Sequence, residues 1–316
     1  MQKSIPTVKE YTCDMKNNFL TGVFAAMCTA LFWGAQSPIA KIIAASGVSQ
    51  VSVMCYRTIF GVATVGLWLL CVKGVGVFNV RRKLMLSYAA VGVLGIGCNA
   101  TGFMLSCVYL SVPQALILHY TFPLVTMAGE AFVTKEKPGR LQVFAGFLVI
   151  LGLYIGFFLK NGGMNGDISA EGIIWGTVSV FAISGQTLIT RKISQTEKPD
   201  PIVQLFFAHL FAGIFLISLK SLLMGWSDLV FMTPRIFIIM HYPAIAGSLL
   251  GFGFLFTALK YIPASTVSMI LTLEIAAALC LTPILLHKMP SLYEIAGCLI
   301  ILAAVLCSII GKAKAA

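Results

Sequence analysis

The sequence predicts an all-α membrane protein, because long stretches of the chain carry almost no charge. Residues 84–134 contain one charged residue, Glu130, and residues 236–287 contain two, Lys260 and Glu274. A helix needs about 20 mostly apolar residues to cross the hydrocarbon of a bilayer, so each stretch is long enough for two crossings. In the whole chain 59% of the residues are hydrophobic and 10% are charged, with a mean hydropathy of +0.94. A soluble domain carries about 25% charged residues.

Helices account for these apolar runs better than a β-barrel does. Lipid offers no partners to backbone N–H and C=O groups, so only helices and closed barrels span it. Barrel strands alternate in polarity over about 10 residues, whereas the runs here are continuous and longer. Turn-forming and charged residues separate them. We therefore expect ten transmembrane helices, at residues 19–45, 50–72, 84–107, 111–133, 141–160, 172–190, 202–224, 236–259, 264–286 and 292–311.

The basic residues predict the orientation of these helices. Of the 22 Lys and Arg residues, 16 fall in segments on the side of the N-terminus, four fall on the other side, and Lys41 and Arg57 lie within spans. Cytoplasmic loops carry such an excess, so we expect a multi-pass protein of the cell (inner) membrane with both termini in the cytoplasm. The net charge of +11 is then a topology signal at a lipid surface, and no nucleic-acid partner is expected.

The two halves of the chain resemble each other. Identical residues recur at separations of 150 to 152 positions: Gly22 and Gly172, Gln36 and Gln186, Gly95 and Gly247, Tyr109 and Tyr261. Five spans in each half is an odd number, so the second copy must be inverted in the membrane, as in many secondary transporters. The expected divisions are a cytoplasmic segment 1–18, a first repeat 19–160, an extracytoplasmic linker 161–171, a second repeat 172–311 and a cytoplasmic tail 312–316.

Short motifs in both halves are similar to those of a known transporter family. They occur at Trp33-Gly34, Pro38, Lys41, Tyr56-Arg57, Tyr109, Pro123-Leu124, Lys135-Glu136-Lys137 and Tyr261-Ile262-Pro263-Ala264. This pattern resembles the EamA family of the drug/metabolite transporter superfamily. The resemblance implies two inverted five-helix repeats around a central substrate cavity. Members move amino acids, nucleotide-like metabolites or drugs, so the resemblance indicates a class of function only.

Three positions depart from the family pattern. Lys135 stands where a glycine is usual, and His287 with Lys288 stands where a glutamate is expected. Glu274 is followed by Ile275 in place of the usual proline, so the carboxylate is kept and the helix-breaking residue is lost. These departures leave the substrate and its coupling open.

Glu274 and His119 are candidate substrate or proton sites, because each lies near the middle of an equivalent predicted span. A charge at the centre of a span costs about 3 kcal/mol. The Glu274 carboxylate could contact a cationic group or exchange a proton, or it could stay neutral or pair with another helix. His119, next to Tyr120, could relay a proton or donate one hydrogen bond between helices.

The other candidate cavity residues carry amide or indole groups. Gln36 and Gln186 occupy equivalent places, and each amide could bind a polar or zwitterionic substrate or join two helices. Trp33 and Asn99 are expected either in the cavity wall or in helix packing.

A second set of residues is expected to act in gating or in structure. Arg57 must meet a carboxylate, face water or snorkel, because arginine stays charged. Pro123 removes a backbone donor and should bend its helix. Small residues let helices approach closely and slide, and the candidates are Gly95, Gly247 and Gly251.

Together these observations favour a secondary, gradient-driven transporter of small organic metabolites that works by alternating access. Amino acids or related polar solutes are the expected substrates and export the expected direction. Uptake or exchange of a nucleotide-like metabolite and drug efflux are alternatives, and a membrane-embedded enzyme or a sensor without flux is the alternative of another class. No ATP-binding loop occurs, so a gradient must drive transport, and no Cys/His metal spacing occurs, so we expect no metal or cofactor. The loops offer only short basic segments and isolated acids and no clustered catalytic groups, so we expect no enzyme. The expected partners are the substrate, protons or another coupling ion, and lipid. The sequence carries no signal for the oligomeric state.

Overall fold

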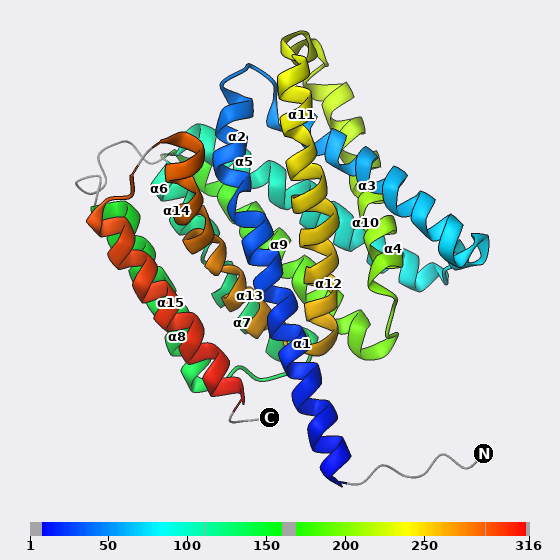
Figure 1. The fold of residues 1–316 in the computed structure, drawn as a ribbon, viewed down its shortest axis with the longest axis vertical. Coiled ribbons are helices and arrows are strands. Elements are labelled where there is room, and N and C mark those ends of the chain that lie inside the picture. The colour runs from blue at the N-terminus through cyan, green and yellow to red at the C-terminus, as the bar shows by residue number, and fades with distance from the viewer. Residues whose placement is uncertain (1–7, 111, 160–168, 288, 314–316) are drawn as a thin grey trace.

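The structure is a computed structural model that describes residues 8–110, 112–159, 169–287 and 289–313. Within these ranges every regular element is a helix (Figure 1). The first half contains α1 (Val8–Gly34), α2 (Gln36–Ala44), α3 (Gln50–Lys73), η1 (Val75–Phe78), α4 (Arg82–Val91), η2 (Gly92–Asn99), α5 (Ala100–Tyr109), α6 (Val112–His119), α7 (Phe122–Val133), α8 (Arg140–Leu153) and η3 (Tyr154–Phe158). The second half contains α9 (Ala170–Thr196), α10 (Pro201–Leu223), η5 (Ser227–Phe231), α11 (Pro234–Tyr242), η6 (Pro243–Gly251), α12 (Phe252–Tyr261), α13 (Ala264–Leu271), α14 (Leu273–Leu286) and α15 (Leu292–Ala313).

Nine helices in the described part of the chain are long and apolar enough to cross a membrane. They overlap nine of the ten ranges expected from the sequence, with bounds that differ by up to six residues. The remaining range, 141–160, coincides with a shorter apolar helix, Arg140–Gly156. The all-helical membrane architecture is therefore confirmed, and the count of ten spans stays a prediction.

The two halves contact each other crosswise. Helix α1 packs against α12, and the equivalent helix α9 packs against α5. Gly22 on α1 would place a Cβ 2.7 Å from Ile262, and Gly172 on α9 would place one 2.5 Å from Leu110. These glycines are therefore needed for the two close crossings. Helices α3 and α10 also pack together, as do α8 and α15 at one side of the bundle (Figure 1).

The third helix of each half contains a π-helical segment, η2 or η6. Such wide turns shift the helix register and are frequent at functional sites. The Gln186 side chain lies where a Cβ of Gly95 in η2 would stand, 1.6 Å from Oε1. Gln36 lies in the same way against Gly247 in η6, with Oε1 2.5 Å from the Cβ position. Each glutamine thus packs on a glycine of the opposite half.

Several predicted spans are broken into two helices. Pro38 has no N–H to donate to Gly34, and the first span changes from α1 to α2 at this point. The fourth span breaks between α6 and α7, with Pro123 in the first turn of α7. The ninth span breaks at Thr272 without a proline at Ile275. Thr272 Oγ1 instead donates to the Met269 carbonyl at 2.7 Å, an alternative to a helical backbone bond.

Candidate functional site

A cavity of about 490 Å³ lies among α1, α2, α3, η2, α6 and α14. It reaches the surface near Gln50 and Met289, and Met289 is 81% exposed. Gln50 begins α3 directly after the α2–α3 connection, and Met289 belongs to the α14–α15 connection. Both connections lie at the end of the molecule opposite to the two termini (Figure 1). Most of the predicted substrate or cavity residues line this space: Trp33, Gln36, Asn99, His119, Tyr120 and Glu274.

Glu274 projects into the cavity from the first turn of α14. The break at Thr272 places Glu274 at the N-terminal, positive dipole end of that helix. Within the described residues the carboxylate has no hydrogen bond and no ion pair. A charge that is partly buried within a membrane span is costly without a partner. A substrate cation or a proton that enters through the cavity can supply one.

His119 belongs to a chain of polar contacts that determines which nitrogen carries its proton. Ser179 Oγ donates to Asn99 Oδ1 at 2.8 Å and lies 2.9 Å from His119 Nδ1. A hydroxyl has one proton, so Ser179 must accept from Nδ1–H. The neutral imidazole then keeps Nε2 as an acceptor. Two hydrogen-bond acceptors, this nitrogen and the Glu274 carboxylate, therefore belong to residues that line the cavity.

Arg57 on α3 supplies the positive charge of the site. Its Nε donates to Ser248 Oγ at 3.0 Å and its Nη1 to Met54 Sδ at 3.3 Å. In the described part of the chain no carboxylate pairs with it, although it is only 6% exposed. A guanidinium has five N–H donors, so several remain for a ligand. Gly247 permits this placement, because a Cβ there would lie 2.7 Å from Nη2.

Trp33 forms part of the wall. Its Nε1 donates to the Gly247 carbonyl at 3.0 Å, and its ring meets Phe252 edge-on at 5.2 Å. Gly251 is the reason that the indole fits, since a Cβ there would lie 2.2 Å from Nε1. Gly247 and Gly251 thus lie behind the wall and position its side chains, while Gly95 lines the cavity itself.

Four predicted residues lie outside the lining: the two glycines behind the wall, Gly247 and Gly251, and also Gln186 and Pro123. Gln186 was expected in the cavity, but its side chain is 1% exposed and fills the space beside Gly95. Neither of its amide atoms has a hydrogen-bond partner within the described residues. Pro123 is buried in the first turn of α7, and its neighbour Phe122 lines the cavity.

Sequence reasoning missed Ser179 and Phe103. Ser179 orients His119, and the Phe103 ring lies 4.6 Å from the imidazole. A serine in an apolar span is common, so the sequence alone offers no signal for its role. The repeat does offer one, because position 179 is equivalent to Thr29, whose hydroxyl donates to the Gly251 carbonyl at 3.1 Å.

Ion pairs between the halves close the end of the molecule that carries the termini. Arg191 binds Glu136 through two bonds of 2.6 and 3.1 Å and donates Nη1 to the Leu259 carbonyl at 3.1 Å. Arg81 and Glu197 approach to 2.8 Å, and Lys73 pairs with Asp200. At the other end Lys220 and Asp228 pair at 2.9 Å. The cavity thus opens at one end of the molecule, and ion pairs join the two halves at the other.

Comparisons with known proteins agree with this architecture. Among solved structures, 28 chains match. One of them, described only as "Crystal structure of protein", superposes with a TM-score of 0.74 at 14% identity, over 93% of this chain and 99% of that chain. No curated protein sequence matches. The sequence profile of the EamA-like transporter family matches residues 20–158 and 170–310, which are the two repeats. The chain therefore belongs to the EamA-like transporter family, membrane transporters of the drug/metabolite transporter superfamily.

Proposed function

We propose that this protein is a gradient-driven carrier of amino acids or related zwitterionic solutes. The observation that carries the proposal is the pair of charges in one cavity, the Glu274 carboxylate and the Arg57 guanidinium, neither of which has an ion-pair partner among the described residues. A free amino acid presents an ammonium and a carboxylate and can supply a partner to each. The His119 Nε2 acceptor adds to the binding of the ammonium.

The walls and the volume of the cavity favour a small solute. About 490 Å³ lies within the usual range of small-molecule sites, and the ring of Trp33 with the half-buried Phe103 supplies apolar surface. Gln36 adds one amide, which can donate or accept. The geometry offers one fixed cation at Arg57, so it suits a single carboxylate better than the several negative charges of a nucleotide.

Alternating access is proposed as the mechanism. The cavity opens at one end, and ion pairs such as Arg191–Glu136 join the repeats at the other. The crosswise contacts of the two repeats support an exchange of the open and closed ends. With the termini in the cytoplasm of the cell (inner) membrane, as the basic residues favour, the open end faces outward. Export is the proposed direction, and Glu274 and His119 are the proposed sites of proton coupling.

Reconstituted protein tests the substrate class. Proteoliposomes should take up a radiolabelled neutral amino acid in counterflow, and unlabelled amino acids should compete. The matching amino alcohol lacks the carboxylate, and the matching carboxylic acid lacks the ammonium; both should compete at least about tenfold less well, since a charged hydrogen bond contributes about 1.5–3 kcal/mol. Equal competition by either analogue would contradict a zwitterion site. Absence of flux for all solutes, with folded protein, would favour a sensor.

Reporter fusions test the orientation. A reporter at Ala316 and one in the loop 161–166 should report opposite sides of the membrane, with the C-terminus in the cytoplasm. Reports from the same side would contradict the inverted arrangement of two five-helix repeats.

A further inference from the structure

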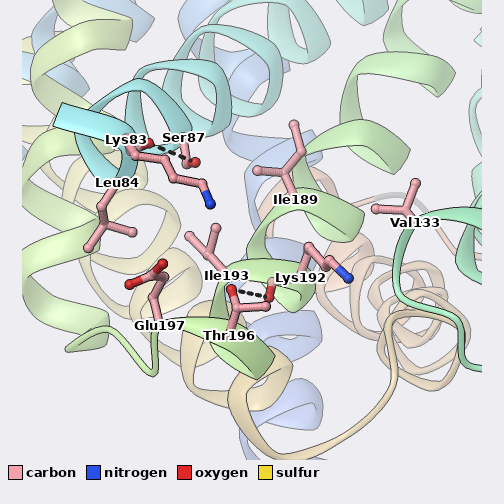
Figure 2. Close-up of a pocket in the computed structure, with 9 residues that line it drawn as sticks. All are labelled: Lys83, Leu84, Ser87, Val133, Ile189, Lys192, Ile193, Thr196 and Glu197. Carbon is pink, nitrogen blue, oxygen red and sulfur yellow. Dashed lines mark hydrogen bonds between the residues drawn. The ribbon is translucent and has the colours of Figure 1, made fainter. Parts of the chain in front are cut away.

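A second cavity, of about 260 Å³, lies between α4, α7 and α9 (Figure 2), at the end of the molecule that the Arg81–Glu197 ion pair joins. Two lysines and two hydroxyl groups surround it: Lys83 and Ser87 come from α4, and Lys192 and Thr196 come from α9. Both pairs lie at the ends of candidate spans, at 82–103 and 170–196. The cavity is therefore at the level where lipid headgroups lie.

The floor of this cavity is apolar and continues into the lipid-facing surface. Ile189 and Ile193 form the floor (Figure 2). Val133 at the rim is 37% exposed, and its neighbour Phe132 is 85% exposed. A ligand with a polar head and an apolar tail can place the head between the lysines and the tail beside α7.

The charge of this cavity is positive. In the described structure neither Lys83 nor Lys192 pairs with a carboxylate. Glu197 also lines the cavity, but it is bound to Arg81 at 2.8 Å. Ser87 and Thr196 donate only to carbonyls of their own helices, at 3.2 and 3.1 Å. These hydroxyls can turn toward an anion at little cost.

The repeat keeps two of the four polar lining positions and replaces the other two. Arg235 is equivalent to Lys83 and Ser46 to Thr196, whereas Ile239 is equivalent to Ser87 and Ile42 to Lys192. The fold therefore accepts apolar residues at the places of Ser87 and Lys192, and these two polar side chains are particular to this cavity.

We propose that this cavity binds the headgroup of an anionic phospholipid, with the phosphate between Lys83 and Lys192 and one acyl chain along the surface at Val133. Basic pockets between transmembrane helices bind such headgroups in this way. The two lysines belong to different repeats, so the bound lipid joins the repeats at the end that the ion pairs also close. Anionic lipid should therefore stabilise the folded protein.

The test measures lipid binding to the purified full-length protein in a neutral detergent. Dioleoyl phosphatidylglycerol should raise Tm in a saturable manner, and dioleoyl phosphatidylcholine should not. The K83Q/K192Q variant should bind phosphatidylglycerol roughly 30-fold more weakly, because it loses two charges near the headgroup. The K83R/K192R variant keeps both charges and should bind normally. The matched control is R82Q/K137Q, which removes two exposed charges at the same end outside the cavity.

Three outcomes would overturn the proposal. Phosphatidylcholine could stabilise as well as phosphatidylglycerol, or R82Q/K137Q could weaken binding as much as K83Q/K192Q. Glycerol 3-phosphate, the headgroup without acyl chains, could bind as tightly as the lipid, which would indicate a site for free anions. The single variants K83Q and K192Q, each expected to weaken binding roughly fivefold, decide the matter if the double variant does not purify.

Discussion

Gln36 and Gln186 occupy equivalent places in the two repeats, and their surroundings differ completely. Both pack on a glycine of the opposite repeat. Gln36 faces the cavity beside Arg57, whereas Gln186 is sealed in the protein without a hydrogen-bond partner among the described residues. The backbone pattern of this protein is duplicated, but the chemistry of its cavity is not. The fold supplies two equivalent walls, and side chains decide which of them can bind a solute.

The same contrast holds for two Lys–Asp pairs at opposite ends of the α3–α10 contact. Lys73 and Asp200 are each about one-third exposed, at 33% and 35%. Lys220 and Asp228 are 1% and 16% exposed, and Asp228 also accepts hydrogen bonds from the first turn of α3. Exposed pairs contribute little to stability, whereas breaking a buried pair leaves a charge without compensation.

The largest expected effect is on transport by Glu274→Gln. Glu274 is one of two glutamates that line the cavity, with Glu294, and the equivalent residue in the first repeat is the buried Phe122. The amide keeps the shape and removes the charge, so flux should fall at least about 100-fold while the free energy of unfolding holds or rises. Flux in proteoliposomes and Tm should be measured on one preparation.

The matched control for Glu274 is Glu136→Gln, which removes a carboxylate at the closed end. It should lower Tm through loss of the Arg191 ion pair and lower flux far less than Glu274→Gln does, because Glu136 does not line the cavity. Normal flux of the Glu274 variant at every pH would remove this residue from the mechanism. A fall in Tm with normal flux per folded molecule would give it a structural role.

The second prediction compares the two Lys–Asp pairs. Asp228→Asn should lower the free energy of unfolding by about 3 kcal/mol, because Lys220 stays buried without a charged partner. Lys73→Gln should lower it by less than about 1 kcal/mol. Chemical unfolding in detergent at neutral pH measures both. Equal losses of unfolding free energy would show that burial does not determine how much each ion pair contributes to stability.

The pH dependence of stability sharpens this comparison. Burial alone would raise the pKa of the Asp228 carboxyl, but the three hydrogen bonds that it accepts outweigh burial and hold its pKa below the ordinary value. A carboxyl with a depressed folded pKa stabilises the protein at neutral pH, and this contribution disappears as the pH falls through the folded pKa. Asp228→Asn should therefore show a flatter loss of stability in acid than the unchanged protein.

The sequence predicts the membrane architecture well, because hydropathy depends on composition over about 20 residues and not on particular contacts. The family and the two repeats are confirmed by the profile match over 20–158 and 170–310. The break in the ninth span was harder to predict. Position 275 holds isoleucine in place of the proline that would have predicted a break in the helix. The helix still breaks at Thr272, where a side-chain hydroxyl replaces part of the backbone hydrogen bonding.

The cavity could be predicted in part. Polar side chains in the middle of spans are costly in lipid, so they predict where a cavity or a polar partner lies. Glu274 and His119 do line the cavity. Which face of a helix points inward depends on crossings that sequence does not specify. Gln186 shows this limit, since its side chain is buried only because Gly95 has no side chain in that place. Whether any of these residues binds substrate stays a prediction.

The third prediction compares the two glycines. Gly95→Ala should destabilise the protein by about 1–3 kcal/mol, because the new Cβ would meet Oε1, Cδ and Cγ of the sealed Gln186 within 2.6 Å. Gly247→Ala should cost less, since the new Cβ meets only the ends of two side chains that border the cavity, Gln36 and Arg57, and both can turn toward it. Adding Gln186→Ala to Gly95→Ala should restore part of the loss. Additive losses in this double-mutant cycle would show that the two residues do not interact.

The smallest expected effect concerns the sealed amide itself. Gln186→Met keeps the length of the side chain and removes polar atoms that have no partner among the described residues, so the free energy of unfolding should stay constant or rise by about 1 kcal/mol. Flux should not change. Gln36→Met makes the same substitution at the equivalent place in the cavity and should weaken substrate binding while Tm stays constant. Thermal unfolding and the concentration dependence of flux, measured on both variants, compare them directly. A loss of stability in Gln186→Met would show that its amide has a hydrogen-bond partner, and normal binding in Gln36→Met would remove that amide from the site.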